Sequence, residues 1–470
     1  MDIKHIADIR PSKRQLKWQQ LEFYGFIHFG INTFADREWG LGTESPSLFN
    51  PTELDAVQWV RAFASAGMRG LILTCKHHDG FCLWPTKYTD YSVKRSPWRG
   101  GRGDLVREVA DACQQYGLKF GIYLSPWDRH EPTYGDSERY NQFYLNQLEE
   151  LLTGYGEIFS VWLDGACGEG PNGKRQVYSW DAYYRLIRRL QPDAVISVCG
   201  PDVRWCGNEA GKVRPEEWSV VPAALQRAER VQEKSQKVDD GRFGREISSQ
   251  DLDLGSRKAI AGIRDLVWYP AEVNTSIRPG WFYHSSEDGK VRSLCELLEI
   301  YFGAVGGNAV LLLNVPPDKR GLIHENDAAR LQELGDYLRR LFRDNLAARA
   351  RFTYSTTAPG WEGRPYWRAP DGVEQAEIEV DLGAAKTFDT VVLGEAIELG
   401  QRIEAFSLSI LQDEEWQEVY SGTVVGYKKI GRFEPATARY VRLSIKESRY
   451  FPTLKTFELY LRPRLPDSVR

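Results

Sequence analysis

The sequence predicts an α/β fold, a (β/α)8 barrel of the TIM type, followed by an all-β sandwich. Short apolar runs recur up to about residue 315, with room for a helix between them. After about residue 345, short segments of alternating apolar and polar residues replace this pattern. We therefore expect a barrel in residues 1–345 and a β-sandwich in residues 346–470, joined near "DNLAARARF".

Eight apolar runs are the candidate barrel strands. In chain order they are "YGFIHFG" from Tyr24, "GLILTC" from Gly70, "KFGIYLS" from Lys119, "FSVWLDG" from Phe159, "AVISVCG" from Ala194, "EWSVV" from Glu217, "LVWYPAEVNTS" from Leu266 and "AVLLLNV" from Ala309. Between several of them, apolar residues recur at helical spacing and a glycine follows, as in 104–117 and 139–156. The sixth run is short and lies in a polar segment.

The C-terminal part carries six segments that alternate between apolar and polar residues. They are "AEIEVDLG", "FDTVVLG", "AFSLSILQ", "WQEVYSG", "RYVRLSIK" and "KTFELYL". Turns separate them, and no helical periodicity interrupts the series. A module of about 120 residues with this pattern is typical of a β-sandwich.

Charge and composition exclude several classes of partner. The 470 residues carry a formal charge of -4 and a pI of about 6.1, so we expect no nucleic acid or anionic membrane as partner. The N-terminal residues lack the apolar run of a signal peptide, and no apolar stretch reaches the roughly 20 residues of a membrane span. Seven cysteines, an odd number, argue against a disulfide framework. We expect a cytoplasmic protein, or a periplasmic or secreted one if a leader has been removed.

Aromatic residues are more numerous than a core requires. The chain has 15 Trp and 23 Tyr. Because these rings are flat and half-polar, they suit flat, half-polar ligands such as sugars.

Polar side chains stand at the ends of three predicted strands. His28 ends the first, His77 and His78 end the second, and Asp164 ends the fourth. Because active sites of (β/α)8 barrels lie at the carboxyl ends of the strands, we expect these residues to converge on one rim. A single histidine at a strand end is more often structural, but three beside a carboxylate favour a functional site.

A metal site is the competing interpretation of the histidines. Zinc hydrolases built on barrels usually present two histidines as H-x-H, so that both rings face the same way. His77 and His78 are adjacent and point to opposite sides in ideal strand geometry. The sequence therefore disfavours a dinuclear metal site, and we expect no metal and no cofactor. A metal-dependent barrel hydrolase stays an alternative, because a strand end can twist.

Five motifs carry a family resemblance. "HFGINTF…EWG", "KHHDGFCLW", "GIYLSPWDRH", "VWLDGA" and "WCGNEAG…EWSVVP" resemble, in order and spacing, the retaining α-L-fucosidases of glycoside hydrolase family 29. The C-terminal part resembles the discoidin-like jelly roll that accompanies these enzymes. This resemblance implies a module similar to a carbohydrate-binding module. The resemblance implies double displacement on a fucosylated oligosaccharide or glycoconjugate, with net retention at the anomeric carbon.

The resemblance also implies the two catalytic carboxyl groups. Asp164 in "VWLDGA" matches the nucleophile of the family. Glu209 in "RWCGNEAG", after the fifth predicted strand, matches the acid/base of the branch selective for α-1,3 and α-1,4 linkages in branched Lewis-type glycans. The small and aromatic neighbours of Glu209 predict a raised pKa, as an acid catalyst requires.

The remaining predicted site residues bind the sugar. By the resemblance, those that hydrogen-bond hydroxyls or wall the fucose are His28, His77, His78, Trp39, Glu44 and Tyr123, because imidazoles, a carboxylate and rings complement an uncharged sugar. Trp281 is either a platform for the 6-methyl group or a neighbouring sugar, or a packing residue. Lys76 and Asp79 are expected to brace the loop.

The predicted function is thus a retaining exo-α-L-fucosidase acting on α-1,3/1,4-linked fucose of branched Lewis-type oligosaccharides. Two alternatives remain besides a metal-dependent hydrolase. One is a broad-specificity fucosidase that cleaves simple fucosides and α-1,2 or α-1,6 links with an acid/base elsewhere. The other is an inactive fucose-binding lectin, which the presence of both carboxyl groups disfavours.

Overall fold

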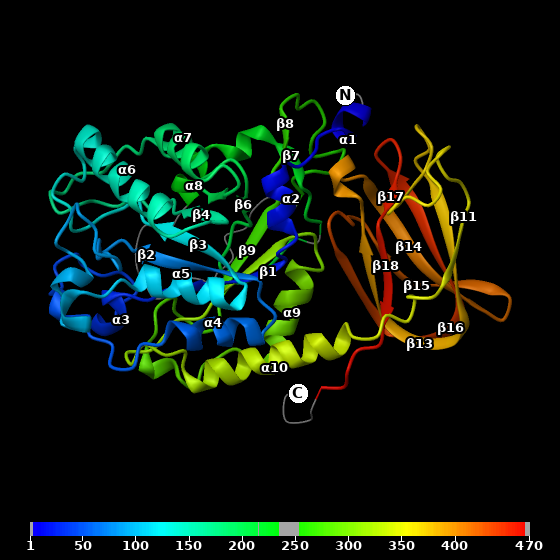
Figure 1. Cartoon of the computed structure of the whole chain (residues 1–470). Helices are drawn as coiled ribbons and strands as arrows, with labels where there is room; N and C mark the ends of the chain where they lie inside the picture. Colours follow the sequence, from blue (N-terminus) through cyan, green and yellow to red (C-terminus); the bar gives the residue numbers. More distant parts are fainter. Residues whose placement is uncertain (1–2, 215, 235–252, 466–470) are drawn as a thin grey trace.

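A computed structural model describes residues 3–214, 216–234 and 253–465, and in it a barrel and a β-sandwich lie side by side (Figure 1). The barrel sheet has eight strands in the order β5-β4-β3-β2-β1-β10-β9-β6. Their bounds are β1 (Phe23–Ile27), β2 (Gly70–Lys76), β3 (Lys119–Leu124), β4 (Ser160–Leu163), β5 (Val195–Val198), β6 (Arg204–Trp205), β9 (Ala271–Ser276) and β10 (Val310–Asn314).

All pairings within this sheet are parallel. A parallel bridge between Ser197 and Val203 joins the two edge strands, so the sheet is nearly closed. The predicted TIM-type barrel is therefore confirmed.

Helices follow most of the barrel strands and surround the sheet (Figure 1). In chain order the described helices are α1 (Ile3–Ala7), α2 (Lys13–Gln19), α3 (Ile31–Ala35), α4 (Ala56–Ser65), α5 (Leu105–Tyr116), α6 (Ser137–Gly154), α7 (Trp180–Leu190), α8 (Ala228–Lys234), α9 (Leu294–Ala304) and α10 (Glu325–Leu341). Of these, α1 and α2 precede β1, and α1 packs against the sandwich through Ile6 and Ile397. The helices predicted in 104–117 and 139–156 are α5 and α6. Asp104 caps the first turn of α5, and Gly117 ends it in the left-handed conformation, at a φ of 70°.

The prediction for the sixth barrel strand was wrong. The barrel uses β6, which is only two residues long and too short to show an alternating pattern. The predicted run from Glu217 instead forms β7 (Val220–Pro222), which pairs antiparallel with β8 (Leu266–Trp268) outside the barrel. It is apolar because the sandwich covers it, and Ser219 N donates to Gln401 Oε1 across that contact at 2.7 Å.

The interior of the barrel is filled with side chains. Aromatic rings from several strands form one cluster that includes Tyr24, Trp162 and Tyr123. Among them lies the buried carboxyl group of Glu272, which accepts hydrogen bonds from the Tyr24 hydroxyl and, at 2.8 Å, from Trp162 Nε1. Burial raises the pKa of Glu272 to about 7. Since the interior is packed, ligands have to bind at the rim.

The C-terminal domain is an antiparallel β-sandwich with its own core, as predicted. Its strands are β11 (Arg351–Tyr354), β12 (Trp367–Arg368), β13 (Ala376–Gly394), β14 (Ile403–Gln412), β15 (Glu415–Gly422), β16 (Lys429–Ser448), β17 (Thr453–Leu454) and β18 (Thr456–Tyr460). The first two predicted segments form one strand, β13, whose register with β16 shifts between Asp381 and Lys386. The predicted boundary at residue 345 lies between α10 and β11.

Polar contacts attach the sandwich to the barrel. Lys428 Nζ lies 2.6 Å from Glu22 Oε2, and Arg257 Nε lies 2.6 Å from Glu404 Oε2. Glu22 immediately precedes β1, so its contact lies at the amino end of a barrel strand. The sandwich therefore leaves the carboxyl ends of the barrel strands to the barrel's own loops.

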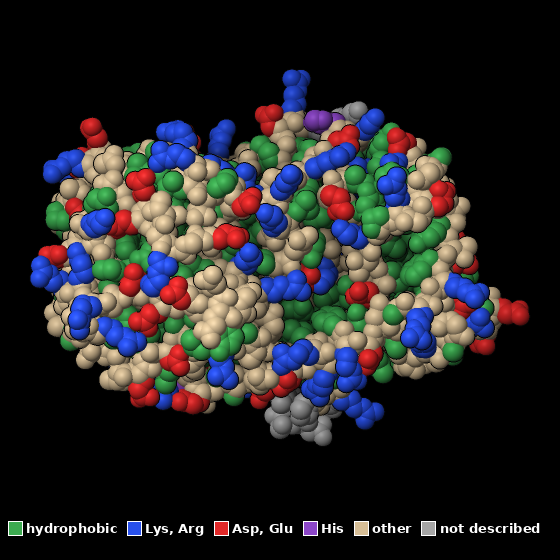
Figure 2. Space-filling model, viewed as in Figure 1, with side chains coloured by type: hydrophobic (Ala, Val, Ile, Leu, Met, Phe, Trp, Pro, Cys, Tyr) green, Lys and Arg blue, Asp and Glu red, His purple; other side chains and the backbone are tan. Residues whose placement is uncertain are grey.

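The surface in Figure 2 mixes cationic and anionic side chains without a continuous basic stripe on that face. Of the helices that the structure describes, none combines the length and apolar character needed to cross a bilayer.

Candidate active site

The polar residues predicted at the strand ends converge on one rim of the barrel. The ring centroids of His28 and His77 are 5.5 Å apart, and those of His77 and His78 are 4.1 Å apart. His78 Nε2 lies 3.9 Å from Asp164 Oδ2. Three imidazoles and one carboxyl group thus face a common space at the ends of β1, β2 and β4.

The expectation that His77 and His78 point to opposite sides was wrong. β2 ends at Lys76, so both histidines lie beyond the pleated part of the strand, and their rings are neighbours. Within the described residues, no group of three or more His, Cys, Asp or Glu side chains has the geometry to hold a metal ion.

Asp164 is oriented by two donors. The Tyr123 hydroxyl donates to Oδ2 at 2.9 Å, and Ala166 N donates to Oδ1 at 2.8 Å. The side chain keeps 22% of its surface exposed, although the strand before it is buried. The carboxyl group is therefore both fixed in direction and reachable from the rim.

Hydrogen-bond partners define the tautomers of two histidines. Asn314 Oδ1 can only accept, so His28 Nδ1, 2.8 Å away, carries the proton. Ser125 Oγ donates its own hydrogen to Trp127 O, so it accepts from His78 Nδ1 at 2.7 Å. In both rings Nε2 is then left as an acceptor for a ligand hydroxyl.

Burial keeps all three imidazoles neutral. It lowers the pKa of His28 to about 3 and that of His78 to about 4, although the charge of Asp164 opposes the second shift. Burial and the two neighbouring histidines hold the pKa of His77 well below its usual value. His77 Nδ1 is also buried, and the described part of the chain offers it no hydrogen-bond partner. A neutral ligand that donates and accepts hydrogen bonds suits these groups better than an anion.

Glu209 lies in the loop after β6, a two-residue strand inside the "RWCGNEAG" segment that follows β5. Asn208 shapes this loop, because its Oδ1 accepts from Ala210 N and its Nδ2 donates to Lys212 O at 2.9 Å. Gly211 has a φ of 77°, and a Cβ there would lie 3.1 Å from Thr275 Cγ2. The second glycine of "GNEAG" is thus required for the loop to pack against β9.

The surroundings of Glu209 favour its protonated form. Trp281 Nε1 donates to Glu209 Oε2 at 3.2 Å. Burial, and then the charge of Asp164, raise the pKa of Glu209 well above its usual value. A carboxyl group that is protonated at neutral pH can serve as a general acid.

Glu38 holds the segment that carries Trp281, and sequence reasoning missed it. Its carboxylate accepts from Trp281 N at 2.9 Å, from Phe282 N at 3.1 Å and from His284 Nε2 at 2.8 Å. The bond to Glu38, opposed by burial and helped by Asp36, raises the pKa of His284 to about 9. Glu38 stands in the "EWG" part of a motif that carries the family resemblance, but its role could not be assigned locally, because its partners lie more than 240 residues along the chain.

Asn314 was also missed, although a signal existed. It ends the last barrel strand, in the same position that drew attention to His28 and Asp164. Its Nδ2 donates to Trp281 O at 2.8 Å while its Oδ1 accepts from His28. Asn314 therefore connects the first strand end with the Trp281 segment.

Trp39 and Trp281 both line the site. The Trp39 ring meets His78 edge-on, with centroids 5.7 Å apart, and the Trp281 ring lies 5.1 Å from that of His28. The carboxylate of Glu44 instead accepts from Leu41 N at 2.7 Å and from the two following backbone amides. A contact between Glu44 and a ligand stays a prediction.

Lys76 and Asp79 brace the second strand end. Lys76 is fully buried and its Nζ lies 2.9 Å from Asp128 Oδ2. Asp79 Oδ1 accepts from Phe81 N at 2.7 Å, and burial raises the pKa of Asp79 to about 7. Lys76 thus connects the end of β2 to Asp128 and to Gln147 of α6, and Asp79 holds the turn that follows.

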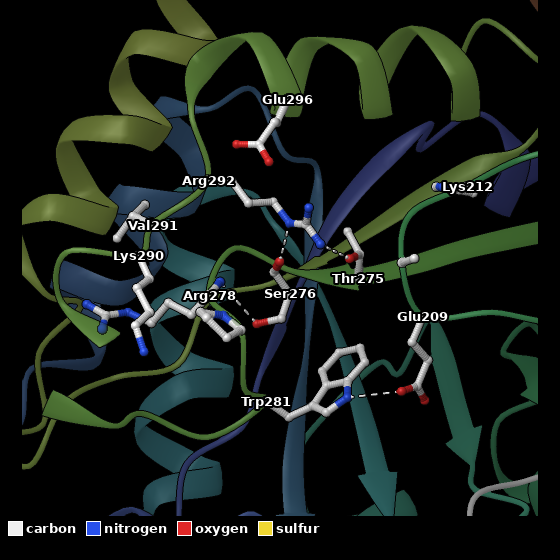
Figure 3. A pocket seen from close by; sticks show the side chains of 12 residues that line it. Glu209, Lys212, Thr275, Ser276, Arg278, Trp281, Lys290, Val291, Arg292 and Glu296 are labelled. Atoms are coloured by element: carbon white, nitrogen blue, oxygen red, sulfur yellow. Dashed lines mark hydrogen bonds between the residues drawn. The ribbon is translucent and has the colours of Figure 1, made fainter. Parts of the chain in front are cut away.

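A pocket of about 380 Å³ adjoins Glu209 and Trp281 on the side of β9 and α9 (Figure 3). Its lining is mainly polar and includes Lys212, Thr275 and Arg292. The pocket therefore extends the rim beyond Glu209 and Trp281, next to the histidines and Asp164.

Two sequence-family profiles match the chain. The profile of the α-L-fucosidases matches residues 10–341, and that of the F5/8 type C domain matches residues 345–456. The two matches cover the barrel and most of the sandwich.

Relatives match over nearly the full length. α-L-fucosidase 1 of Arabidopsis thaliana is 41% identical over 468 residues, which cover 96% of this chain and 87% of the plant protein. A Bacteroides ovatus crystal structure superimposes with a TM-score of 0.86 at 48% identity, covering 99% of this chain and 77% of that one. A Ruminococcus gnavus fucosidase of glycoside hydrolase family 29, solved in complex with fucose, gives a TM-score of 0.82 at 30% identity, with 97% and 96% covered.

Proposed function

The chain belongs to the α-L-fucosidases of glycoside hydrolase family 29, and on this basis we propose that it hydrolyses terminal α-1,3- or α-1,4-linked L-fucose from branched Lewis-type oligosaccharides with net retention. One observation carries the catalytic part of the proposal. Asp164 ends a barrel strand beside three neutral histidines, and Glu209 faces it with a raised pKa. Two carboxyl groups in different environments are what a glycosidase needs.

In the first step, a carboxylate oxygen of Asp164 attacks the anomeric carbon of fucose. The bond from that carbon to the glycosidic oxygen breaks, and Glu209 gives its proton to the departing oxygen. The products of this step are the shortened glycan and a covalent fucosyl ester on Asp164. The two donors on Asp164 keep the carboxyl group directed for the attack.

In the second step, Glu209 acts as the base. It takes a proton from a water molecule, whose oxygen attacks the anomeric carbon and displaces Asp164. Fucose leaves, and both carboxyl groups return to their starting states. Two displacements at one carbon give net retention, and they require the two carboxyl groups to stand about 5–5.5 Å apart in the working complex.

The histidines recognise the fucose hydroxyls. Nε2 of His28 and His78 accepts, and Nδ1 of His77 meets a further hydroxyl. The rings of Trp39, Tyr123 and Trp281 offer apolar faces for the C–H groups of the sugar. Glu44 is the remaining predicted contact.

The linkage preference is supported by the loop of Glu209. Its "RWCGNEAG" sequence resembles the branch selective for α-1,3 and α-1,4 linkages, and the adjacent pocket gives room for a branched glycan. A loop-borne acid can couple binding of the branch to assembly of the site, so that remote binding energy lowers the barrier. The sandwich, proposed here as residues 346–470, is an auxiliary module.

The test compares two substrates and one variant. The protein should release fucose from a Lewis trisaccharide more efficiently than from an aryl fucoside. Glu209→Ala should lose the trisaccharide activity, and azide should restore turnover of an aryl fucoside with a good leaving group, because that substrate needs no acid and azide replaces the activated water.

Three results would contradict parts of the proposal. Preference for the aryl fucoside would favour a broad-specificity enzyme, and full activity of Glu209→Ala on the trisaccharide would place the acid/base elsewhere. Fucose binding without release of fucose from either substrate would favour a lectin.

A further inference from the structure

The pocket beside Glu209 carries an excess of positive charge. Lys212, Lys290 and Arg292 line it, against the single additional carboxylate of Glu296. In Figure 3 the Arg292 guanidinium lies in the middle of the pocket, with Lys212 and Lys290 on opposite sides. Glu209 adds no charge to this balance while it is protonated.

The guanidinium of Arg292 is held in position by the end of β9. Its Nε donates to Ser276 O at 2.8 Å, and its Nη2 donates to Thr275 Oγ1 at 3.1 Å. Both acceptors are uncharged oxygens, and these two bonds fix the direction of the guanidinium. Arg292 therefore presents a fixed cation rather than a flexible one.

The two lysines are solvent-exposed, and the described part of the chain provides neither with an ion-pair partner. Glu296 is engaged at the start of α9, where its Oε2 accepts from Ser293 N at 2.8 Å and from Ser293 Oγ at 2.9 Å. Its charge offsets one of the three cations.

Arg278 also borders the pocket but adds no net charge. Its Nε lies 2.7 Å from Asp327 Oδ2 and its Nη1 lies 2.9 Å from Asp288 Oδ1. The side chain is fully buried in this pairing. The positive excess thus comes from Lys212, Lys290 and Arg292.

The position of the pocket relates it to the leaving group. A general acid protonates the glycosidic oxygen, so the glycan that departs on that oxygen extends past Glu209. The pocket begins at Glu209 and Trp281 (Figure 3). Resting on the proposed role of Glu209, we propose that this pocket binds an anionic oxygen group, a carboxylate or a sulfate, carried by the departing glycan.

The experiment compares three trisaccharides of the same linkage. One is neutral, one carries a sulfate on its galactose, and one carries an acidic sugar at the same place. At low ionic strength, kcat/KM for at least one acidic substrate should exceed that for the neutral one by about fivefold, and added salt should reduce the ratio. The two acidic arms distinguish sulfate from carboxylate.

Lysine variants assign the effect to the pocket. Lys290→Gln and Lys212→Gln should each lower the acidic-to-neutral ratio about twofold and leave kcat/KM for the neutral substrate unchanged. Lys119→Gln is the matched control, because this exposed lysine starts β3 at the other end of the barrel and pairs with Glu157 at 3.1 Å. Arg292→Lys keeps the charge but not the planar fork, so it should lower the ratio less than Arg292→Gln.

Equal or lower activity on both acidic substrates, or a ratio that the pocket lysines do not change, overturns the inference. Cleavage of an aryl fucoside but of no trisaccharide contradicts the linkage proposal instead. The pocket is then tested with aryl fucosides that carry a carboxylate or a carboxamide, comparing the wild type with Lys290→Gln so that intrinsic reactivity cancels. An unchanged ratio in that comparison also overturns the inference.

Discussion

Glu38→Gln should impair catalysis without unfolding the protein. The carboxylate receives three hydrogen bonds, from the backbone amides of Trp281 and Phe282 and from the His284 ring. A hydrogen bond to a charged group contributes about 1.5–3 kcal/mol, and one between neutral groups about 0.5–1.5 kcal/mol. A glutamine offers one acceptor oxygen and turns an NH₂ group toward a donor, so one bond is lost and the others weaken. The segment loses about 3 kcal/mol of local stabilisation.

This loss is transmitted to Glu209, the proposed acid/base, because Trp281 Nε1 donates to its carboxyl group. If the whole loss is expressed in the transition state, kcat/KM falls about 100-fold, since about 1.4 kcal/mol corresponds to a factor of ten. The assay is steady-state release of fucose, with thermal unfolding measured on the same preparation. A small change in Tm with a large change in kcat/KM would separate positioning from folding.

Asp36→Asn is the matched control. Asp36 contacts the other nitrogen of the same ring, with His284 Nδ1 2.7 Å from its Oδ1, but its side chain is 61% exposed. Exposed ion pairs contribute about 0–1 kcal/mol, so kcat/KM should fall less than about fivefold. The reasoning on Glu38 is refuted if Glu38→Gln costs no more activity than Asp36→Asn.

Three further predictions concern the rim. Asp164→Ala should lower kcat by roughly three orders of magnitude or more with an unchanged unfolding temperature, and near-normal turnover would remove Asp164 from the nucleophile role. Relative to a variant that lacks His78, the free energy of unfolding should lose about 3 kcal/mol as the pH falls from about 6.5 to about 4, because unfolded His78 then binds a proton that the folded protein excludes. The difference in unfolding free energy between the wild type and His78→Asn should change by this amount, whereas the difference between the wild type and the exposed His5→Asn should stay constant. An equal pH slope in the wild type and His78→Asn would contradict the assignment. Prolonged chelation should leave activity unchanged, whereas loss that zinc restores would favour a metallohydrolase.

The sequence predicted most of the fold because its signals are local. Buried parallel strands appear as apolar runs, and α5 and α6 end where glycine and helical spacing indicate. The prediction of the sixth strand was wrong because its signal is not local. β6 is only two residues long and is defined by its pairing with β9 in the sheet. β7 is apolar because the sandwich covers it, a tertiary effect that no periodicity reports.

The same distinction between local signals and tertiary effects applies to the site residues. His28, His77, His78 and Asp164 could be predicted because each is polar at the end of an apolar strand. The neighbouring rings of His77 and His78 could not, because the strand ends at Lys76 and alternation no longer applies. Glu38 and its partners come from opposite ends of the barrel sequence, and only closure of the sheet brings them together.

The proposed sugar-binding residue His28 and the proposed acid Glu209 are connected through one segment of backbone. Asn314 binds His28 through its Oδ1 and Trp281 O through its Nδ2, while Trp281 N is held by Glu38. The indole of the same Trp281 donates to Glu209. A sugar hydroxyl that donates to His28 Nε2 therefore contacts a ring whose Nδ1 donates to Asn314. The Asn314 side chain in turn holds the backbone of Trp281, the residue whose indole donates to Glu209. Because these contacts connect His28 with Glu209, a substitution of His28 should lower kcat as well as raise KM. Substitution of a binding residue without such a connection would change KM alone.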